Sequence, residues 1–494
     1  MKTKIILSTI LSATLAMVSC GHQALNGPEN SGNAGTSGSA VAYITSSDGS
    51  RLFERADIPF VNTVEPSQSS ILVNIDASVS YQEIDGFGAA LTGASCYNLL
   101  KMSKENRTAL LKEIFSLEEG LGMSLVRVSI GASDFSVDDE FTWCDEEGLE
   151  HFAVHQEDRD YLFPILKEVY EINPGLKIIA SPWSAPIWMK RRSTSDNSPY
   201  PSWTSGSLAP EYYQTYAEYF VKWIKTMEKE GFDIYAMTIQ NEPLNHGNSM
   251  SMYMTWEEQS EFISSALGPA FEKAGINTKI LVFDHNYNYD NVASQKNYPL
   301  NIYNNPEASK YVAGSAWHNY GGSVNTLSGI HTYAPEKEIY FTEASIGTWN
   351  YDFSKCLIND FKSIFIQTMQ NYSKGVTLWN LMLDENRGPY RPGGCSTCFG
   401  VVTLNSVNGT VMSRQSHYYN IAHASKVIRP GAVRIKADGY VPSGVNYLAF
   451  KNVDGSIAMI FVNESEEARE LVLREGSLLV HTAIPASSIE SIVL

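Results

Sequence analysis

Short apolar segments alternate with longer amphipathic ones between residues 81 and 424 of the chain. Eight of the apolar segments have the length of a strand: "DGFGAAL", "MSLVRVSI", "LKIIASPW", "DIYAMTIQ", "KILVFD", "AGSAWHN", "IYFTEAS" and "GVTLWNL". Several segments between them place apolar residues three or four positions apart, which is the period of an amphipathic helix. This alternation predicts the α/β class and a (β/α)8 TIM barrel, a fold of about 250 residues that tolerates insertions.

Local signals for helix ends agree with this pattern. Ser103 is a suitable N-cap for the amphipathic segment that follows it. Pro210 and Gly231 stand at the two ends of a second such segment, in the positions where Pro favours a helix start and Gly a helix stop. Thr255 and Glu258, in "TWEE", have the spacing of a capping box. These signals predict helices between the barrel strands.

Both ends of the chain have strand-like patterns without helices. Residues 425–494 contain short alternating segments and a hairpin signal at Asp454-Gly455, and residues 41–80 contain segments such as "SILVNID". Neither end has enough strands for a stable sandwich of its own. We therefore expect residues 41–80 and 425–494 to form one β-sandwich beside a barrel of residues 81–424.

The first residues have the pattern of an export signal. Lys2 and Lys4 precede an apolar segment, Ile5 to Val18, that is too short to cross a bilayer comfortably, and Ser19 then precedes Cys20. This pattern resembles a bacterial lipoprotein signal of residues 1–20, cleaved before Cys20 and lipidated on it, and an ordinary secretory signal is the alternative. Residues 21–40 are rich in Gly, Ser and Asn and predict a flexible tether. The expected location is the outer membrane, on its periplasmic side or at the cell surface, with the lipid as the only membrane contact.

Charge narrows the possible partners. The chain has 36 Lys and Arg against 54 Asp and Glu, a formal net charge of −18. Nucleic acids are bound by stripes of Lys and Arg, so nucleic acid is not an expected partner.

Five cysteines remain besides Cys20. Two of them, Cys395 and Cys398, have the C-x-x-C spacing, which a local disulfide or two free thiols explain better than a metal site, because no second pair or His cluster accompanies them.

Carboxylates stand at the ends of two predicted barrel strands. The fourth strand ends in Gln240-Asn241-Glu242-Pro243 and the seventh in Thr342-Glu343-Ala344-Ser345. Active sites of such barrels lie at the C-terminal ends of the strands. Two carboxyl groups facing each other there can hydrolyse a glycosidic bond, one as acid and the other as nucleophile or base. A strand-end Glu with a purely structural role is the alternative for each residue alone.

These motifs resemble glycoside hydrolase family 30, which includes lysosomal glucosylceramidase and bacterial and fungal β-glucanases. The resemblance extends over about residues 80–435, through "IDGFGAALTGAS", "LVRVSIGASDFS", "IIASPWSAPIWMK", "AMTIQNEP", "SAWHNYGG", "YFTEAS" and "LWNLMLDENRGP". It implies a (β/α)8 barrel with a side β-sandwich built from both chain ends. It also implies a retaining β-glycosidase, with a β-glucan or β-glucoside as substrate and endo-acting cleavage of β-1,6-glucan as the preferred activity.

The resemblance also implies residue roles. Glu242 would be the general acid/base and Glu343 the nucleophile. Asn241 would hydrogen-bond the sugar 2-hydroxyl, Asp134 would bind hydroxyls of the nonreducing-end sugar, and Trp183 and Trp379 would shape the sugar pocket. Two more would support the nucleophile, Tyr320 as its neighbour and Arg127 as a cation that keeps it ionised. Plain core packing of the Trp residues and a structural ion pair of Arg127 are the alternatives. The residues after strand five, "DHN", depart from the Asp-Asp-Gln of glucosylceramidase.

Other readings of the same residues are weaker. His318, in "WHNY", is more plausible as a hydrogen-bonding residue of the pocket than as an acid, base or metal ligand. No metal-ligand spacing, phosphate-binding loop or serine nucleophile motif is present in the sequence, so neither a metal nor a cofactor is predicted. A β-glucosidase, glucosylceramidase-like or β-xylanase activity is the enzymatic alternative, and a non-catalytic carbohydrate-binding lipoprotein is the alternative from another class. A monomer is expected.

Overall fold

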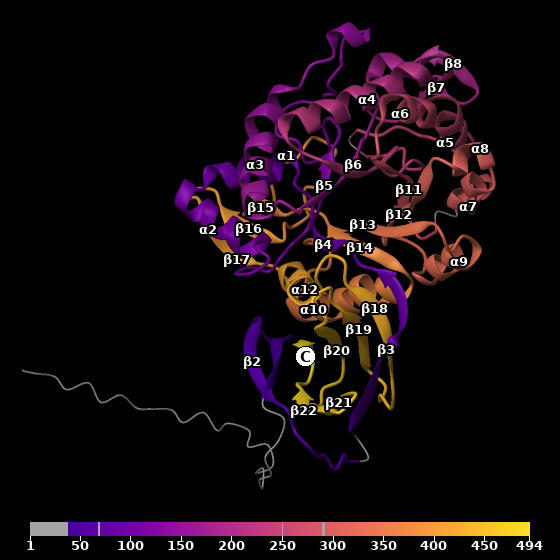
Figure 1. Ribbon diagram of the computed structural model, residues 1–494. Helices are drawn as coiled ribbons and strands as arrows, with labels where there is room; N and C mark the ends of the chain where they lie inside the picture. Colours follow the sequence, from indigo (N-terminus) through magenta and orange to yellow (C-terminus); the bar gives the residue numbers. More distant parts are fainter. Residues whose placement is uncertain (1–37, 68–69, 249, 289–291) are drawn as a thin grey trace, which may run out of the picture.

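The computed structural model describes residues 38–67, 70–248, 250–288 and 292–494 (Figure 1). The predicted signal, the lipidation site Cys20 and nearly all of the predicted tether lie outside these residues. Across the described residues, none of the helices combines the length and the apolar character that crossing a bilayer requires.

Eight parallel strands form a closed barrel, as the sequence predicts. The hydrogen-bonded order is β4-β14-β13-β12-β11-β10-β6-β5, and a bridge between Ala90 and Arg127 joins the first strand to the last. The strands are β4 (Gly86–Ala89), β5 (Leu125–Ser129), β6 (Lys177–Ser181), β10 (Ile234–Thr238), β11 (Lys279–Asn286), β12 (Val312–His318), β13 (Glu338–Glu343) and β14 (Ser373–Leu378). All eight predicted strands are therefore present, in the predicted chain order.

Helices surround this barrel (Figure 1). They are α1 (Gly93–Lys101), α2 (Lys104–Phe115), α3 (Phe163–Ile172), α4 (Tyr213–Glu230), α5 (Trp256–Phe262), α6 (Gly268–Ala274), α7 (Tyr298–Tyr303), α8 (Pro306–Ser309), α9 (Asn325–Tyr333), α10 (Phe353–Asp360), α11 (Gln367–Gln370) and α12 (Ser416–Ser425). The π-helical turn Asp158–Leu162 precedes α3, Ile263–Leu267 joins α5 to α6, and Phe361–Ile366 joins α10 to α11. Short 3₁₀ turns lie at Leu149–His151, Ile187–Met189, Pro210–Tyr212 and Ala293–Gln295.

The predicted helix ends are observed. The Ser103 hydroxyl accepts a hydrogen bond from the Asn106 amide at the start of α2, and Thr255 forms both bonds of the capping box with Glu258 at the start of α5. Gly231 ends α4 with a φ of 97°, a left-handed conformation that glycine adopts without steric cost.

Two small sheets decorate the loops of the barrel. One contains β7 (Lys190–Ser193), β8 (Asp196–Pro199) and β9 (Ser207–Leu208), and the other β15 (Met382–Asp384), β16 (Val402–Asn405) and β17 (Thr410–Arg414).

Both chain ends form a second, all-β unit next to the barrel (Figure 1). Its nine strands make one hydrogen-bonded sheet in the order β2-β1-β23-β20-β19-β18-β3-β21-β22. They are β1 (Ser39–Ser46), β2 (Glu54–Pro59), β3 (Ile71–Glu83), β18 (Val433–Asp438), β19 (Val445–Lys451), β20 (Ile457–Asn463), β21 (Arg469–Glu475), β22 (Leu478–Ile484) and β23 (Ser488–Val493). A bridge between Phe60 and Val480 brings the two sheet edges together, so the sheet rolls over a core that includes Val73, Phe461 and Ile492. The predicted sandwich from both chain ends is confirmed.

Helix α12 connects the two units. Its buried His423 hydrogen-bonds with Ser491 of β23 and Thr45 of β1, at 2.8 Å each. One side chain of α12 is thus bonded to both β1 and β23.

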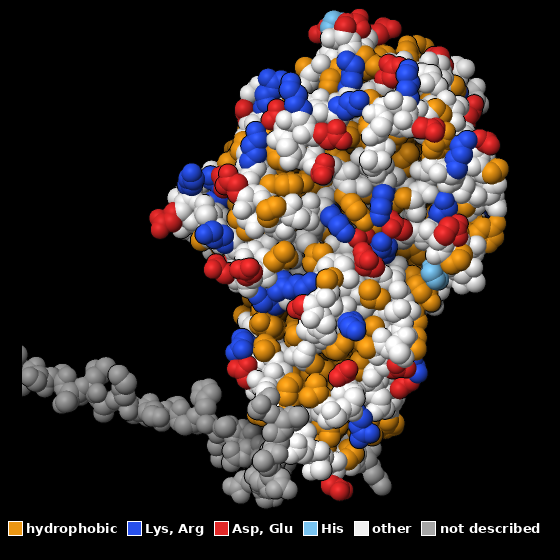
Figure 2. All heavy atoms as spheres, viewed as in Figure 1, with side chains coloured by type: hydrophobic (Ala, Val, Ile, Leu, Met, Phe, Trp, Pro, Cys, Tyr) orange, Lys and Arg blue, Asp and Glu red, His pale blue; other side chains and the backbone are white. Residues whose placement is uncertain are grey.

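Charges of both signs are interspersed over the face of the molecule shown in Figure 2, rather than gathered into a patch of one sign. This distribution agrees with the mixed composition of the chain.

Candidate active site

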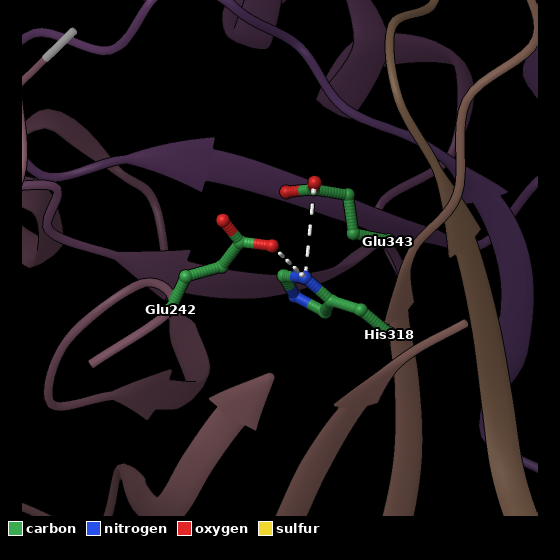
Figure 3. Close-up of side chains that lie close together, drawn as sticks. All are labelled: Glu242, His318 and Glu343. Carbon is green, nitrogen blue, oxygen red and sulfur yellow. Dashed lines mark hydrogen bonds and ion pairs between the residues drawn. The ribbon is translucent and has the colours of Figure 1, made fainter. Parts of the chain in front are cut away.

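Glu242 and Glu343 lie together at the C-terminal mouth of the barrel (Figure 3). Glu343 is the last residue of β13, and Glu242 follows β10 after three intervening residues. Both side chains are buried, and one carboxylate oxygen of each lies within 4.8 Å of the other. The two groups that the sequence places a hundred residues apart therefore converge on one cavity.

The backbone at Glu242 has an uncommon conformation. Its φ is 46°, in the left-handed region that residues other than glycine rarely adopt. The Glu242 amide donates to the carbonyl of Asp284 on β11, at 3.0 Å, and the Asn241 amide donates to the carbonyl of Pro182 after β6, at 2.8 Å. Bonds to both neighbouring strands hold this turn, and the turn directs the carboxylate into the mouth.

His318 lies between the two carboxylates. Its Nδ1 is 3.3 Å from Glu242 Oε1 and 3.8 Å from Glu343 Oε1, and its Nε2 is 3.0 Å from Asp284 Oδ1. The predicted pocket histidine is thus in direct contact with the predicted acid/base. Glu242, His318 and Glu343 also offer three ligand atoms close enough together to hold a metal ion.

Arg127 forms an ion pair with Glu343. Its guanidinium donates to Glu343 Oε2 at 2.6 Å, to Asn241 Oδ1 at 2.8 Å and to Asp284 Oδ2 at 2.7 Å. Arg127 and Asp284 are fully buried. A buried charge is costly unless it is paired and hydrogen-bonded, and this cluster meets that condition for the arginine.

Asp284 has more hydrogen-bond partners than the sequence suggests. Besides Arg127 and His318, its carboxylate accepts bonds from Ser181, Thr238 and Thr342, at 2.7 to 2.8 Å. Burial would raise the pKa of Asp284, but Arg127 and these donors hold it well below its usual range. Asp284, on β11, is therefore an ionised group that is bonded to side chains of five other barrel strands, β5, β6, β10, β12 and β13.

Neighbouring charges also shift the pKa values of Glu242 and His318. Burial would raise the pKa of Glu242, but the hydrogen bond from His318 and the charges of His285 and His318 lower it to about 2. Burial would lower the pKa of His318, but the charge of Glu343 and the bonds with Asp284 and Glu242 raise it to about 9. At neutral pH these shifts favour the ionised form of Glu242 and the protonated form of His318.

The remaining predicted residues line the same cavity of about 390 Å³. The rings of Trp183 and Trp379 stack with centroids 5.1 Å apart, above the guanidinium of Arg127. The Tyr320 hydroxyl donates to Glu343 Oε1 at 3.1 Å. Asp134 is half-buried beside the two glutamates, and desolvation, followed by their charges, raises the pKa of Asp134 to about 8.

Several residues of the cavity lining were not predicted as site residues. Asn245 and Asn248 each donate to Glu242 Oε2, at 2.8 Å. His285 and the exposed Trp349 are also part of the lining. Asn245, Asn248 and Trp349 lie beyond the motifs quoted from the sequence, whereas His285 belongs to the "DHN" segment. The "DHN" departure places His285 at the cavity, and Asn286 accepts a bond from the Tyr320 amide.

Cys395 and Cys398 form a disulfide, which decides between the two alternatives left open by their spacing. Both residues line the cavity. Cys96, Cys144 and Cys356 are free thiols.

Comparisons of the sequence and of the structure with known proteins agree on one family. The profile of the glycosyl hydrolase family 30 TIM-barrel domain matches residues 84–428, and that of the family 30 beta sandwich domain matches residues 431–492. The endo-1,6-beta-D-glucanase of Neurospora crassa is 32% identical over 440 residues, which cover 86% of this chain and 88% of that protein. The lysosomal acid glucosylceramidase of Mus musculus is 26% identical, over 86% of this chain and 83% of that protein. The solved structure of an endo-beta1,6-glucanase superposes with a TM-score of 0.89 at 49% identity, over 92% of this chain and 99% of that one.

Proposed function

Because the chain belongs to glycosyl hydrolase family 30, we propose that it is a retaining enzyme that cleaves internal β-1,6-glucosidic bonds of a glucan. The observation that carries the proposal is the convergence of Glu242 and Glu343, with oxygens within 4.8 Å of each other. Carboxyl groups about 5 to 5.5 Å apart suit direct attack on the sugar, whereas about 6.5 to 9.5 Å leaves room for a water between. The β-1,6 linkage is supported by the named activity of the relatives with 32% and 49% identity.

In the first step an oxygen of Glu343 forms a bond to the anomeric carbon. The bond to the leaving sugar breaks, and the departing oxygen takes a proton from Glu242. Arg127, 2.6 Å from Glu343 Oε2, keeps the nucleophile ionised until it attacks. Tyr320 donates to the other oxygen and fixes the orientation of the carboxylate.

The proton for this step comes through His318. Both oxygens of Glu242 accept hydrogen bonds, from His318 on Oε1 and from Asn245 and Asn248 on Oε2. These bonds favour the ionised form. When the leaving oxygen of a substrate lies at Glu242 Oε1, the proton moves from His318 Nδ1 to Oε1 over the 3.3 Å contact and from Oε1 to that oxygen.

In the second step a water oxygen forms a bond to the anomeric carbon, the ester bond to Glu343 breaks, and the water proton goes to Glu242. The ionised form of Glu242 that the resting site favours is the form that this step needs. Two inversions at the anomeric carbon give net retention.

The other cavity residues bind the sugar. Asn241 Oδ1 accepts from Arg127, so its NH₂ group faces the pocket and can donate to the 2-hydroxyl. Asp134, next to both glutamates, binds further hydroxyls, and Trp183 and Trp379 provide apolar faces.

The nucleophile can be tested by trapping. Incubation with 2-deoxy-2-fluoro-β-glucosyl fluoride should esterify Glu343, as seen by mass spectrometry of the peptide that contains it. Label on another residue, or none, would contradict the assignment.

The acid/base can be tested by rescue. Glu242→Gln should lower kcat/KM on a β-1,6-glucan by about 10²- to 10⁴-fold. Added azide should restore turnover of β-glucosyl fluoride and yield β-glucosyl azide, because azide needs no base. Glucosyl azide of the α configuration would exclude retention.

The linkage specificity can be tested by identifying the products released from different polysaccharides. The protein should release oligosaccharides from β-1,6-glucan before glucose, and should act more slowly on β-1,3- and β-1,4-glucans, xylan and glucosylceramide. Faster hydrolysis of any of these would replace the proposed substrate, and binding of sugar without turnover would favour a carbohydrate-binding protein.

We also propose that the protein is an exported lipoprotein that acts as a monomer. Lys2, Lys4 and the apolar segment before Cys20 support export and lipidation, and a single chain supplies all the described groups of the site. Labelled palmitate should be incorporated into the wild type and not into Cys20→Ala, and light scattering should give the mass of one chain.

A further inference from the structure

The three tryptophans that line the cavity differ in their exposure to solvent. Trp183 and Trp379, near the carboxylates, are 2% and 4% exposed, whereas Trp349 on the same cavity is 55% exposed. The first two rings therefore meet the sugar that is cleaved. The third lies where the cavity opens and can only meet what extends out of it.

An exposed tryptophan ring is unfavourable in water. The ring of Trp349 presents a large apolar face that is costly to hydrate, and its place on the cavity lining puts that face where a bound ligand can cover it. Its flat ring offers an apolar face together with an N–H donor, a combination that suits the C–H face and the hydroxyl edge of a pyranose.

The position of the ring is restricted by its neighbours. A Cβ atom added at Gly347 would lie 2.0 Å from Cζ3 of Trp349 and 2.4 Å from the carbonyl oxygen of Thr397. The ring thus packs directly on the glycine backbone. The Asn350 amide donates to the Gly347 carbonyl and closes the turn that carries Trp349.

The disulfide-bonded loop holds this turn from the other side. The Thr348 amide donates to the Thr397 carbonyl at 2.9 Å, and the Phe399 amide donates to the Ile346 carbonyl at 2.8 Å. Gly347 and Cys398 form a β-bridge between these bonds. The segment that contains the disulfide is therefore paired, as a short antiparallel ladder, with the segment that carries Trp349.

The same loop also contacts the interior of the site. The Arg391 amide donates to the Asp134 carbonyl at 2.8 Å, and the Cys395 amide donates to the Asp134 carboxylate. The Arg391 side chain pairs with Asp139 and Glu140. Residues 391–398 thus span from the buried part of the sugar pocket to its rim.

We propose that Trp349 is a stacking surface for the sugar next to the one held by Glu242 and Glu343, and that the Cys395–Cys398 loop fixes this surface in place. This inference rests on the proposed function, because it assigns a second subsite to the same glucan. It makes Trp349 a substrate-binding residue and the disulfide a positioning device.

The experiment compares two substrates. β-Glucosyl fluoride occupies only the subsite between the carboxylates, whereas a β-1,6-linked gluco-oligosaccharide also reaches the rim. Trp349→Ala should lower kcat/KM for the oligosaccharide by about tenfold, mainly through KM, and should leave β-glucosyl fluoride within about twofold of the wild type. Trp349→Phe should restore most of the loss, because it restores an aromatic face.

A matched control separates this effect from general loss of an exposed aromatic ring. Tyr440 is also 55% exposed and lies on the β-sheet unit. Tyr440→Ala should leave both substrates unchanged.

The contribution of the disulfide is measured by a double-mutant cycle. The paired change Cys395→Ser and Cys398→Ser should lower oligosaccharide turnover in the wild-type background, and should cost clearly less when Trp349 is already Ala. Equal costs in both backgrounds would overturn the positioning role. Circular dichroism and thermal unfolding confirm that each variant is folded.

Two results for Trp349 would overturn its role: equal losses on both substrates, or no loss on either. If the proposed function itself were wrong, the wild type would hydrolyse neither the fluoride nor the oligosaccharide, and this result differs from both of those for Trp349.

Discussion

At the residue scale, Glu242 and His318 form a buried pair that holds one transferable proton. The hydrogen bond and charge of His318 lower the pKa of Glu242 to about 2, against the effect of burial, and the pKa of His318 rises to about 9. The proton is lost from the pair as a unit. A small fraction of the pair carries it on Glu242, and this fraction stays constant until the pair as a whole deprotonates.

This coupling predicts a change in the pH profile of His318→Gln. In the wild type the basic limb of kcat/KM on β-1,6-glucan should follow loss of the pair proton, close to the His318 pKa of about 9. In the variant the glutamine cannot carry the proton, so Glu242 itself must be protonated before the reaction. The basic limb should therefore move to lower pH by more than about one unit.

β-Glucosyl fluoride is the control for this measurement. Fluoride leaves without a proton from the enzyme, so its kcat/KM should show no such displacement of the basic limb. An unchanged limb on the glucan would show that the proton does not come through His318.

Asp284 has the most hydrogen-bond partners of the network below the site, and its charge is the feature that Asn cannot replace. Asp284→Asn should lower the free energy of unfolding by about 3 kcal/mol, because it leaves Arg127 with less negative charge in a buried position. Urea unfolding measures the loss. Ser181→Ala, which removes one neutral donor to the same carboxylate, should cost about 1 kcal/mol, and an equal cost for both would contradict the charge argument.

The site residues at strand ends could be predicted from the sequence. Those whose role depends on contacts with distant parts of the chain could not. Glu242 and Glu343 could be found because strand period and strand order place them at one end of a barrel. Asp284 ends an apolar segment in the same manner, but its importance comes from partners on other strands, which no local pattern shows. Asn245 and Trp349 lie on irregular loops, where side-chain direction depends on turns that the sequence alone does not determine.

At the element scale, the N-terminal end of the barrel is closed by a cluster of charges. Lys279 and Lys374 both pair with Glu338, at 2.7 and 2.8 Å, and Lys177 and Tyr340 donate to Asp85. Burial alone would raise the pKa values of Asp85 and Glu338, but the lysines lower both. These bonds join strands β6, β11, β13 and β14 to the residue before β4.

This cluster predicts a loss of stability in acid. A carboxyl group whose folded pKa lies below its unfolded value, about 3.9 for Asp and 4.3 for Glu, stabilises the fold above that value. The contribution is lost as the pH falls through the folded pKa. The difference in melting temperature between the wild type and Glu338→Gln should therefore be largest near pH 7 and should shrink below about pH 4. A difference that grows in acid would contradict this sign.

Element boundaries with a local chemical cause could be predicted, and those with a tertiary cause could not. Ser103, Thr255 and Gly231 end or begin helices through bonds or backbone angles of their own neighbourhood. The π-helical turns within the outer helices have no such signal. The small sheet of β7–β9 lies in "KRRSTSDNSPYPSW" and beyond, a segment whose polar composition gave no strand pattern.

At the scale of the whole molecule, the last strand of the chain lies inside the sheet and not at its edge. β23 pairs with β1 on one side and β20 on the other, and Ile492 is fully buried. Ile492→Asp should lower the free energy of unfolding by at least about 3 kcal/mol, because it places an unpaired charge in the sheet core. Val407→Asp, at a position 90% exposed, should change it by less than about 0.5 kcal/mol. Urea unfolding of both variants tests the difference, and similar values would mean that the last strand contributes little.

The pairing of residues 41–46 with residues 488–493 also sets an order of events in biosynthesis. While the ribosome is still translating the middle of the gene, the nascent β1 has no β23 to join, and the polar backbone groups along that side stay open. The native sheet can close only after residues 488–493 have been synthesised. A nonsense mutation just before codon 488 should therefore be nearly as damaging as one in the barrel, because both β1 and β20 would lose a neighbouring strand.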